Sequence, residues 1–383
     1  MKFILVQFTL AVVFMFIYLK GYFPFTHHEA TIINPPTEIE GIPLDLNQFY
    51  KPQVQKMVLI IIDALRYDFV TEKDMPFLYS NMDCLLKVKV EAPTVTLPRI
   101  KALTTGAIPQ FIDIVLNLGA TAKVADSFLH RAHASGKKMV FYGDNTWLMM
   151  FPNLFVREEG TTSFFVNDFT EVDNNVTRHI DSELKKDWDM MFLHYLGLDH
   201  IGHVRGPFNS LIHTKLHEMD DIIKKIITTS NTWDNDTIIM ITGDHGMKDS
   251  GGHGGTTYAE THVPLILHHN KGINCKLHSV DVSDQIIQQS DIANTISALF
   301  SIAMPANSAG KILPQLLTLN KSQLLYTLFY NSLILQRNAE NLNNCHENLQ
   351  LARYLFKNAV QTSNFETSDA KKLRNCLNNV CNK

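Results

Sequence analysis

The chain has 383 residues, of which 45% are hydrophobic and 19% are charged, and its formal net charge at pH 7 is -4. This length is enough for one large α/β domain or two ordinary domains, each with a sizeable core. Nucleic-acid backbones bind to positively charged surfaces, and this slightly acidic chain has no basic stripe, so we expect no nucleic-acid partner.

The first 25 residues differ in composition from the rest of the chain. Residues 3–19, FILVQFTLAVVFMFIYL, are 17 residues without a charge, which is the lower limit for crossing a bilayer. No cleavage site with small residues follows, so for residues 1–25 we favour a membrane anchor, and a cleaved signal segment stays open as the alternative. Sequons at Asn175, Asn235 and Asn320, taken with this segment, favour a lumenal body.

The five cysteines do not indicate a zinc ribbon, because their number is odd and no CxxC pair occurs. Three of them fall in the last forty residues, so a disulfide in the tail is left open without a pairing.

The elements that follow predict an α/β fold. Residues 26–54 contain prolines and are irregular, as in a linker. Short apolar runs at MVLIIIDAL, KKMVFYGD, WDMMFLHYLGLD, DTIIMITGDHG and VPLILHH then have the pattern of strands buried on both faces. Helical periodicity lies between them, for example over residues 210–230. We therefore predict a mostly parallel central sheet with helices on both faces over residues 55–318, followed by a helical tail over residues 319–383.

Acidic residues recur at the ends of the predicted strands. Asp63, Asp144, Asp199 and Asp244 each stand at or just after the carboxyl end of an apolar run. In open α/β sheets, ligands bind outside that edge. One aspartate there is ordinary in a turn, but four together favour a site, with the start of the next loop as the alternative for Asp144.

Histidines accompany these acids at spacings that suit metal ions. In HYLGLDHIGH, Asp199 and His203 are four residues apart and share a face if the segment is helical. In GDHGMKDSGGHGG, Asp244 and His245 are followed by His253, and the glycines allow the backbone to bend. With Asp63, these nitrogen and oxygen ligands suit two divalent cations, most simply Zn²⁺.

The segment APTVTLPRIKALTTG, residues 92–106, offers a nucleophile. Pro98 stands where a first helical turn would begin, so Thr96 would lie just before the helix, at its partially positive end. Such a position stabilises a phosphate, although a plain N-cap is the better explanation of a threonine there when the segment is taken alone. Beside two metal ions, the Thr96 hydroxyl would become nucleophilic at neutral pH.

These residues resemble the alkaline phosphatase superfamily, in its phosphodiesterase and phosphoethanolamine-transferase branch. The resembling stretches run from about residue 57 to 320, and they include LIIIDALRYDF, VFYGDNTW and TSFFVNDFTEVDNNVTRHI. The resemblance implies an alkaline-phosphatase-like catalytic domain at 55–318, preceded by one N-terminal membrane helix. Relatives in this branch continue into many membrane helices, whereas nothing after residue 25 is apolar enough to span, so we expect the catalytic domain without that region.

The resemblance also implies roles for individual residues. One metal ion would be held by Asp63, Thr96, Asp244 and His245, and the other by Asp199, His203 and His253. Thr96 would be the nucleophile, and Asn117 in DIVLNLG would place its amide on the phosphate, unless it is an ordinary helix-end asparagine.

The activity that the resemblance implies is lipid-linked group transfer. Phosphoethanolamine would pass from phosphatidylethanolamine to a mannose, the second one, of a GPI anchor precursor. The protein would lie in the endoplasmic reticulum membrane with its catalytic domain in the lumen. The resemblance leaves open a small membrane protein as a partner subunit. A phosphodiesterase that hydrolyses the same intermediate and a non-catalytic partner protein stay open as alternatives.

Overall fold

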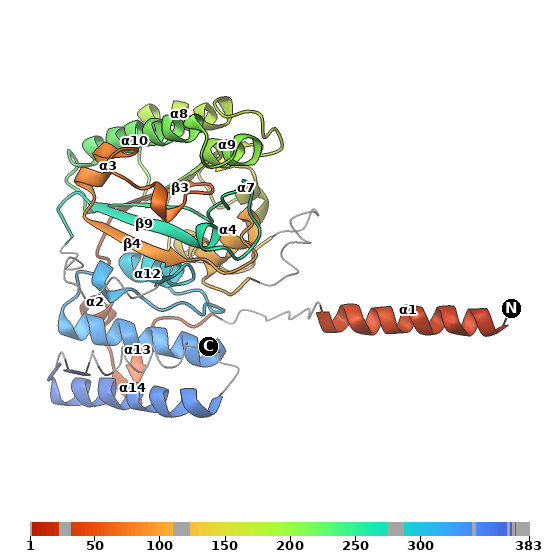
Figure 1. Ribbon diagram of the computed structural model, residues 1–383. Helices are drawn as coiled ribbons and strands as arrows, with labels where there is room; N and C mark the ends of the chain where they lie inside the picture. Colours follow the sequence, from red (N-terminus) through yellow and green to blue (C-terminus); the bar gives the residue numbers. More distant parts are fainter. Residues whose placement is uncertain are drawn as a thin grey trace.

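The computed structural model describes residues 2–22, 32–109, 123–273, 287–338 and 342–365, together with positions 368, 369 and 372. In this part of the chain an eight-stranded sheet lies between two layers of helices, and a further helical pair packs below one layer (Figure 1). The predicted α/β architecture is confirmed.

The strands of the sheet lie in the order β10-β4-β9-β8-β3-β7-β5-β6. Strand β9 is antiparallel to both of its neighbours, and the other pairs are parallel. The bounds are β3 Lys56–Ile62, β4 Cys84–Lys89, β5 Met139–Asp144, β6 Arg157–Thr161, β7 Met190–Tyr195, β8 Thr237–Thr242, β9 His262–His269 and β10 Ile287–Gln288. All five apolar runs of the sequence form strands, whereas the less uniformly apolar strands β4, β6 and β10 were not predicted.

The central strands are apolar throughout because both of their faces are covered. In β3, Met57, Leu59 and Ile61 belong to one core, which also holds residues of α4 (Thr96–Thr105), α6 (Phe128–Ala134), α7 (Thr146–Met150) and α12 (Asp291–Phe300). The alternate residues of β3 belong to a second core, shared with α3 (Pro76–Asn81), α8 (Glu171–Glu183), α9 (Gly197–Arg205) and α10 (Ser210–Ser230). Figure 1 shows α3, α8, α9 and α10 above the sheet and α12 below it.

The segment before the sheet packs against the C-terminal helices. It contains a short hairpin and one helical turn, β1 (Glu38–Ile39), β2 (Ile42–Pro43) and α2 (Leu46–Phe49). Their apolar side chains share a third core with α13 (Lys321–Asn338) and α14 (Leu342–Thr362). The Tyr326 hydroxyl donates to the carbonyl of Pro36 at 2.9 Å, and Tyr330 donates to that of Ile33 at 2.6 Å.

The N-terminal segment forms a helix, α1, from Lys2 to Tyr22. Among the residues that are described, we find no helix with both the length and the apolar character that crossing a bilayer demands. The anchor role of residues 1–25 stays a prediction.

The buried carboxylate of Glu183, near the β5–β6 end of the sheet, is expected to make the stability of the fold depend on pH. Glu183, with 1% of its side chain exposed, accepts hydrogen bonds from Tyr142, Arg157 and Lys186. Burial alone would raise the pKa of Glu183, but these hydrogen bonds outweigh it and lower the pKa to about 2. A carboxylate with a depressed folded-state pKa stabilises the fold above its unfolded pKa, and that contribution disappears as the pH falls towards the folded value.

Replacing Glu183 with glutamine should therefore lower the free energy of unfolding at pH 7 by about 2 kcal/mol, allowing for screening of the partly exposed Arg157 and Lys186 by water. The difference from the wild type should shrink as the pH falls below about 4.5. Urea denaturation at several pH values measures this, and a difference that stays constant down to pH 3 would contradict the assignment.

Candidate active site

The sheet brings the predicted acids together at its carboxyl edge. Asp63 directly follows β3, and Asp244 stands two residues after β8, the neighbouring strand. On the other side of β3, strand β7 leads into helix α9, whose first turn carries Asp199. Parallel strands end at one edge, so residues nearly two hundred positions apart become neighbours.

A first group of side chains surrounds Asp63. The Thr96 hydroxyl lies 3.4 Å from Asp63 Oδ2 and 3.5 Å from His245 Nε2. His245 Nε2 is also 3.4 Å from Asp63 Oδ1 and 3.4 Å from Asp244 Oδ2. The acids and His245 are buried, whereas Thr96 is half-buried, so the hydroxyl is the accessible member of this group.

The backbone at Asp63 is arranged to hold the group. Ala64 has φ = 60°, a left-handed conformation that residues other than glycine seldom adopt. This turn directs the Ala64 N–H to Asp244 Oδ1 at 3.2 Å. Strain of this kind persists where the surrounding structure imposes it, and it is common at functional sites.

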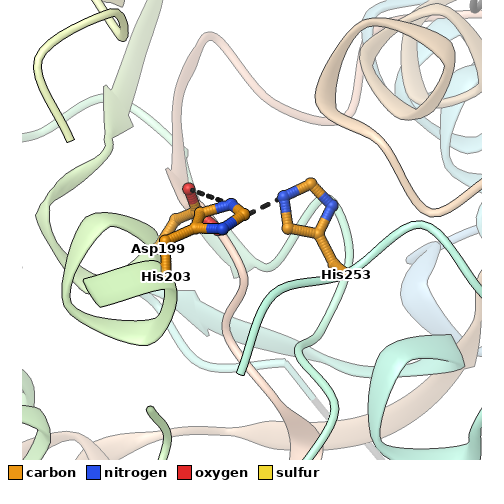
Figure 2. A group of neighbouring side chains, drawn as sticks. All are labelled: Asp199, His203 and His253. Atoms are coloured by element: carbon orange, nitrogen blue, oxygen red, sulfur yellow. Dashed lines mark ion pairs between the residues drawn. The ribbon is translucent and has the colours of Figure 1, made fainter. Parts of the chain in front are cut away.

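A second group consists of Asp199, His203 and His253 (Figure 2). Asp199 and His203 lie on one face of α9, as their spacing predicts, with 3.4 Å between Asp199 Oδ2 and His203 Nε2. His253 faces them from the loop after β8, with its Nε2 3.5 Å from Asp199 Oδ1. The two groups adjoin, because the rings of His245 and His253 stack with their centroids 3.9 Å apart.

Backbone carbonyls set the tautomers of two of these histidines. His245 Nδ1 lies 3.0 Å from the carbonyl oxygen of Gly246, and His253 Nδ1 lies 2.6 Å from that of Thr94. A carbonyl only accepts, so each Nδ1 carries the hydrogen and each Nε2 keeps a free lone pair. This is the arrangement that metal-ligating histidines have.

Most of the ionisable side chains of the site are buried away from water, and burial shifts their pKa values. Burial, followed by the charge of neighbouring acids, raises the pKa values of Asp63 and Asp199 well above the ordinary range. Burial lowers the pKa values of His245 and His253 to about 3. The imidazoles are thus neutral over the physiological range, which leaves the carboxylates without a cationic histidine to balance them.

The residues present fit divalent cations. Asp63 Oδ1 and Asp244 Oδ2 are buried and have no hydrogen-bond partner in the described part of the chain. Buried carboxylate oxygens without partners are costly unless a cation coordinates them. Together with imidazole nitrogens they form a mixed N and O donor set of the kind that zinc prefers.

The stretch VDNNVTRHI holds helix α9 in place. Asp173, which is fully buried, accepts hydrogen bonds from the backbone N–H groups of Leu196 and Gly197 at 2.9 and 3.0 Å. Its other oxygen pairs with Lys215 at 2.8 Å. A Cβ at position 197 would stand 2.3 Å from Asp173 Oδ2, so this approach requires glycine. The N-terminus of the helix that carries Asp199 and His203 is therefore anchored.

Three details differ from the sequence-based expectations. Helix α4 begins at Thr96, with Val95 as its N-cap, so Thr96 lies in the first turn rather than before the helix. Asn117 lies outside the described residues, and its expected role stays a prediction. His194, for which the sequence suggested no role, stands 3.5 Å from Asp63; the signal for it was a polar residue inside an apolar strand.

Comparisons with known proteins add to this geometry. Residues 121–293 match the family model of the type I phosphodiesterase / nucleotide pyrophosphatase. The chain is 40% identical over 316 residues to the catalytic subunit of GPI ethanolamine phosphate transferase 2 of Homo sapiens, covering 78% of this chain and 32% of that protein. It is 42% identical over 297 residues to the GPI ethanolamine phosphate transferase 2 of Schizosaccharomyces pombe, covering 70% and 39%. The chain thus spans only 32% to 39% of the length of these relatives.

Solved structures show a similar fold. A protein of the alkaline phosphatase superfamily from Vibrio parahaemolyticus superimposes with a TM-score of 0.50 at 17% identity, covering 74% of this chain and 75% of that one. Murine ectonucleotide pyrophosphatase / phosphodiesterase 5, in an inactive form in complex with AMP, gives a TM-score of 0.50 at 12% identity, covering 65% and 96%. From the sheet, the cluster at its carboxyl edge and these similarities, we conclude that the chain has an alkaline-phosphatase-like fold and resembles, over part of their length, the GPI ethanolamine phosphate transferase 2 proteins.

Proposed function

We propose that this chain transfers phosphoethanolamine from phosphatidylethanolamine to a mannose, the second one, of a GPI anchor precursor. The observation that carries the proposal is the position of Thr96, whose half-buried hydroxyl lies 3.4 Å from Asp63 and 3.5 Å from His245 at a cluster suited to metal ions. The relatives named GPI ethanolamine phosphate transferase 2 support ethanolamine phosphate as the transferred group and GPI as the acceptor class.

Two metal ions would complete the site. Asp63, Thr96, Asp244 and His245 would hold one, and Asp199, His203 and His253 would hold the other. Such ions, with zinc the preferred one, would lower the pKa of a bound hydroxyl and neutralise charge on the phosphate.

The chain's own residues would then carry the reaction in two displacements. Thr96 Oγ1 attacks phosphorus and forms a new P–O bond, while the bond from phosphorus to the diacylglycerol oxygen breaks. The departing oxygen takes up the proton that Thr96 loses. A mannose hydroxyl next attacks phosphorus, and Thr96 leaves with a proton. Throughout, Thr96 stands in the first turn of the ten-residue helix α4, whose free N–H groups favour the anionic phosphate.

A lumenal, membrane-associated location is part of the proposal. Cys84 is disulfide-bonded, and disulfides persist in oxidising compartments such as the lumen of the endoplasmic reticulum. Asn235, the first residue of one sequon, is exposed, as glycosylation requires.

A product assay with the purified chain separates the three candidate functions. Zinc-supplemented protein would be mixed with vesicles that contain phosphatidylethanolamine labelled in its ethanolamine, with and without a mannose-containing GPI precursor. We expect labelled phosphoethanolamine on the precursor. If free phosphoethanolamine is released at the same rate in both samples, the chain is a hydrolase rather than a transferase, which is the activity that the type I phosphodiesterase match favours. Zinc binding without any product would favour a non-catalytic partner.

A further inference from the structure

His194 occupies a special place beside the first metal group. It is the penultimate residue of β7, is fully buried, and stands opposite Ile61 of β3 in the sheet. Its Nε2 lies 3.5 Å from Asp63 Oδ2. By distance alone, Asp63, His194 and Asp244 could hold a metal ion together. Whether His194 can be a ligand therefore depends on which ring nitrogen carries the hydrogen.

Trp147 determines that protonation. The indole Nε1–H of Trp147 points to His194 Nδ1 at 3.1 Å. An indole nitrogen only donates, so Nδ1 of His194 must accept, and the neutral ring must carry its hydrogen on Nε2. This is the opposite of His245 and His253, whose Nδ1 atoms face carbonyl oxygens. An N–H group has no lone pair for a metal ion, so His194 is not a ligand in this tautomer.

Nε2 of His194 lies next to the proposed ligand Asp63, 3.5 Å from its Oδ2. In the described part of the chain this buried nitrogen has no hydrogen-bond partner, so Asp63 is the acceptor within its reach. Asp63 Oδ2 also faces the Thr96 hydroxyl at 3.4 Å. The Thr96 hydroxyl and His194 Nε2 therefore both lie beside Oδ2, which leaves Oδ1, a buried oxygen without a hydrogen bond, for a cation.

The surroundings hold Trp147 and His194 rigidly. The Trp147 ring is buried and stacks on Phe141, with centroids 5.3 Å apart. On the neighbouring strand β5, Gly143 has φ = 149°, and a Cβ there would stand 2.5 Å from the carbonyl oxygen of His194. Only glycine lets the two strands approach at this point.

We propose that His194 is a positioning residue which, with its tautomer set by Trp147, donates from Nε2 to Asp63 Oδ2 and so orients Oδ1 towards the first metal ion. The inference rests on the proposed two-metal function. Partners of this kind around a metal ligand are typically worth 10- to 100-fold in metal affinity, in order of magnitude.

Zinc titrations of the purified chain by chelator competition test the proposal without any substrate. His194→Leu removes the donor and should weaken one of two zinc sites by about 10- to 100-fold, leaving the other unchanged. His194→Gln places an amide N–H near the former Nε2 and should restore most of the affinity. His268→Leu is the matched control, because His268 is also a buried histidine of the sheet but bonds to Asn81 and Asn231 instead.

Nitrogen-15 NMR of the histidine rings gives a second readout, which reports the tautomer of the wild-type protein directly and does not depend on zinc affinity. The His194 ring, assigned by its loss in the glutamine variant, should show a protonated Nε2 and a bare Nδ1, and Trp147→Phe should mix the tautomers. A hydrogen on Nδ1, or a leucine variant that binds both zinc ions as the wild type does, would overturn the proposal. A wild-type chain that binds no zinc would instead overturn the two-metal function, while the ring spectrum still decides the contact with Trp147.

Discussion

Replacing Thr96 with alanine is expected to abolish the covalent intermediate and to lower the rate of phosphoethanolamine transfer by about 10³-fold or more. Without the hydroxyl, no side-chain atom stands at the point from which Oγ1 reaches both Asp63 and His245. The remaining residues can still bind and polarise a phosphodiester, so a small residual rate is expected rather than none.

The measurement is a labelled-adduct experiment with phosphatidylethanolamine labelled in its ethanolamine. Acid-quenched wild-type protein should carry label on Thr96, and the alanine variant should carry none. Thr96→Ser is the matched control, because it keeps a hydroxyl at the same place. An adduct of undiminished intensity on the alanine variant would disprove the role of Thr96, whatever the transfer rate.

The second large effect is expected from replacing Asp244 with asparagine. Asp244 is fully buried, one of its oxygens has no hydrogen-bond partner among the described residues, and it lies 3.4 Å from His245. The variant removes one negative charge from the ligand set, so zinc affinity at the first site should fall more than about 100-fold.

The same substitution should stabilise the zinc-free protein. Buried acids close to one another destabilise the fold when they are charged, and burial together with its neighbours raises the pKa of Asp63 in this cluster. An asparagine amide in place of the Asp244 carboxylate removes part of that repulsion, by about 1–2 kcal/mol at pH 7. Asparagine also keeps an oxygen that can accept from the Ala64 N–H, as Asp244 Oδ1 does.

Thermal unfolding with and without zinc tests both halves of this prediction. Zinc at about 100 times its dissociation constant should stabilise the wild type by roughly 2.7 kcal/mol per site, and most of the contribution of the first site should be missing in the variant. Asp249→Asn is the control, since Asp249 lies in the same loop but is exposed and pairs with Arg66. If the variant is less stable than the wild type without zinc, repulsion between the buried carboxylates does not destabilise the zinc-free fold.

Local patterns in the sequence correctly predicted five strands, one long helix and the shared helical face of two candidate site residues. The apolar runs became β3, β5, β7, β8 and β9, and residues 210–230 became α10 with the expected bounds. The spacing of Asp199 and His203 predicted a shared helical face, and they lie on one. These features depend on residues near one another in the chain, where periodicity carries the information.

Other features were out of reach for the sequence because they depend on which strands are neighbours. Strand β9 reads like the parallel strands, and its antiparallel direction follows from the path of the chain around the sheet. The start of α4 at Thr96 rather than near Pro98 depends on the packing of the helix, since proline is also tolerated later in a first turn.

The α/β class, the strand-end aspartates and the identity of the Asp, His and Thr residues that meet thus follow from local patterns of the chain, because spacing and strand ends are local properties. Three features follow from long-range packing instead: His245 stacks on His253, backbone carbonyls leave the Nε2 atoms of both rings free, and Trp147 gives His194 the opposite tautomer. The direction of a ring hydrogen depends on the partner that long-range packing places beside each nitrogen, and no spacing along the chain records it.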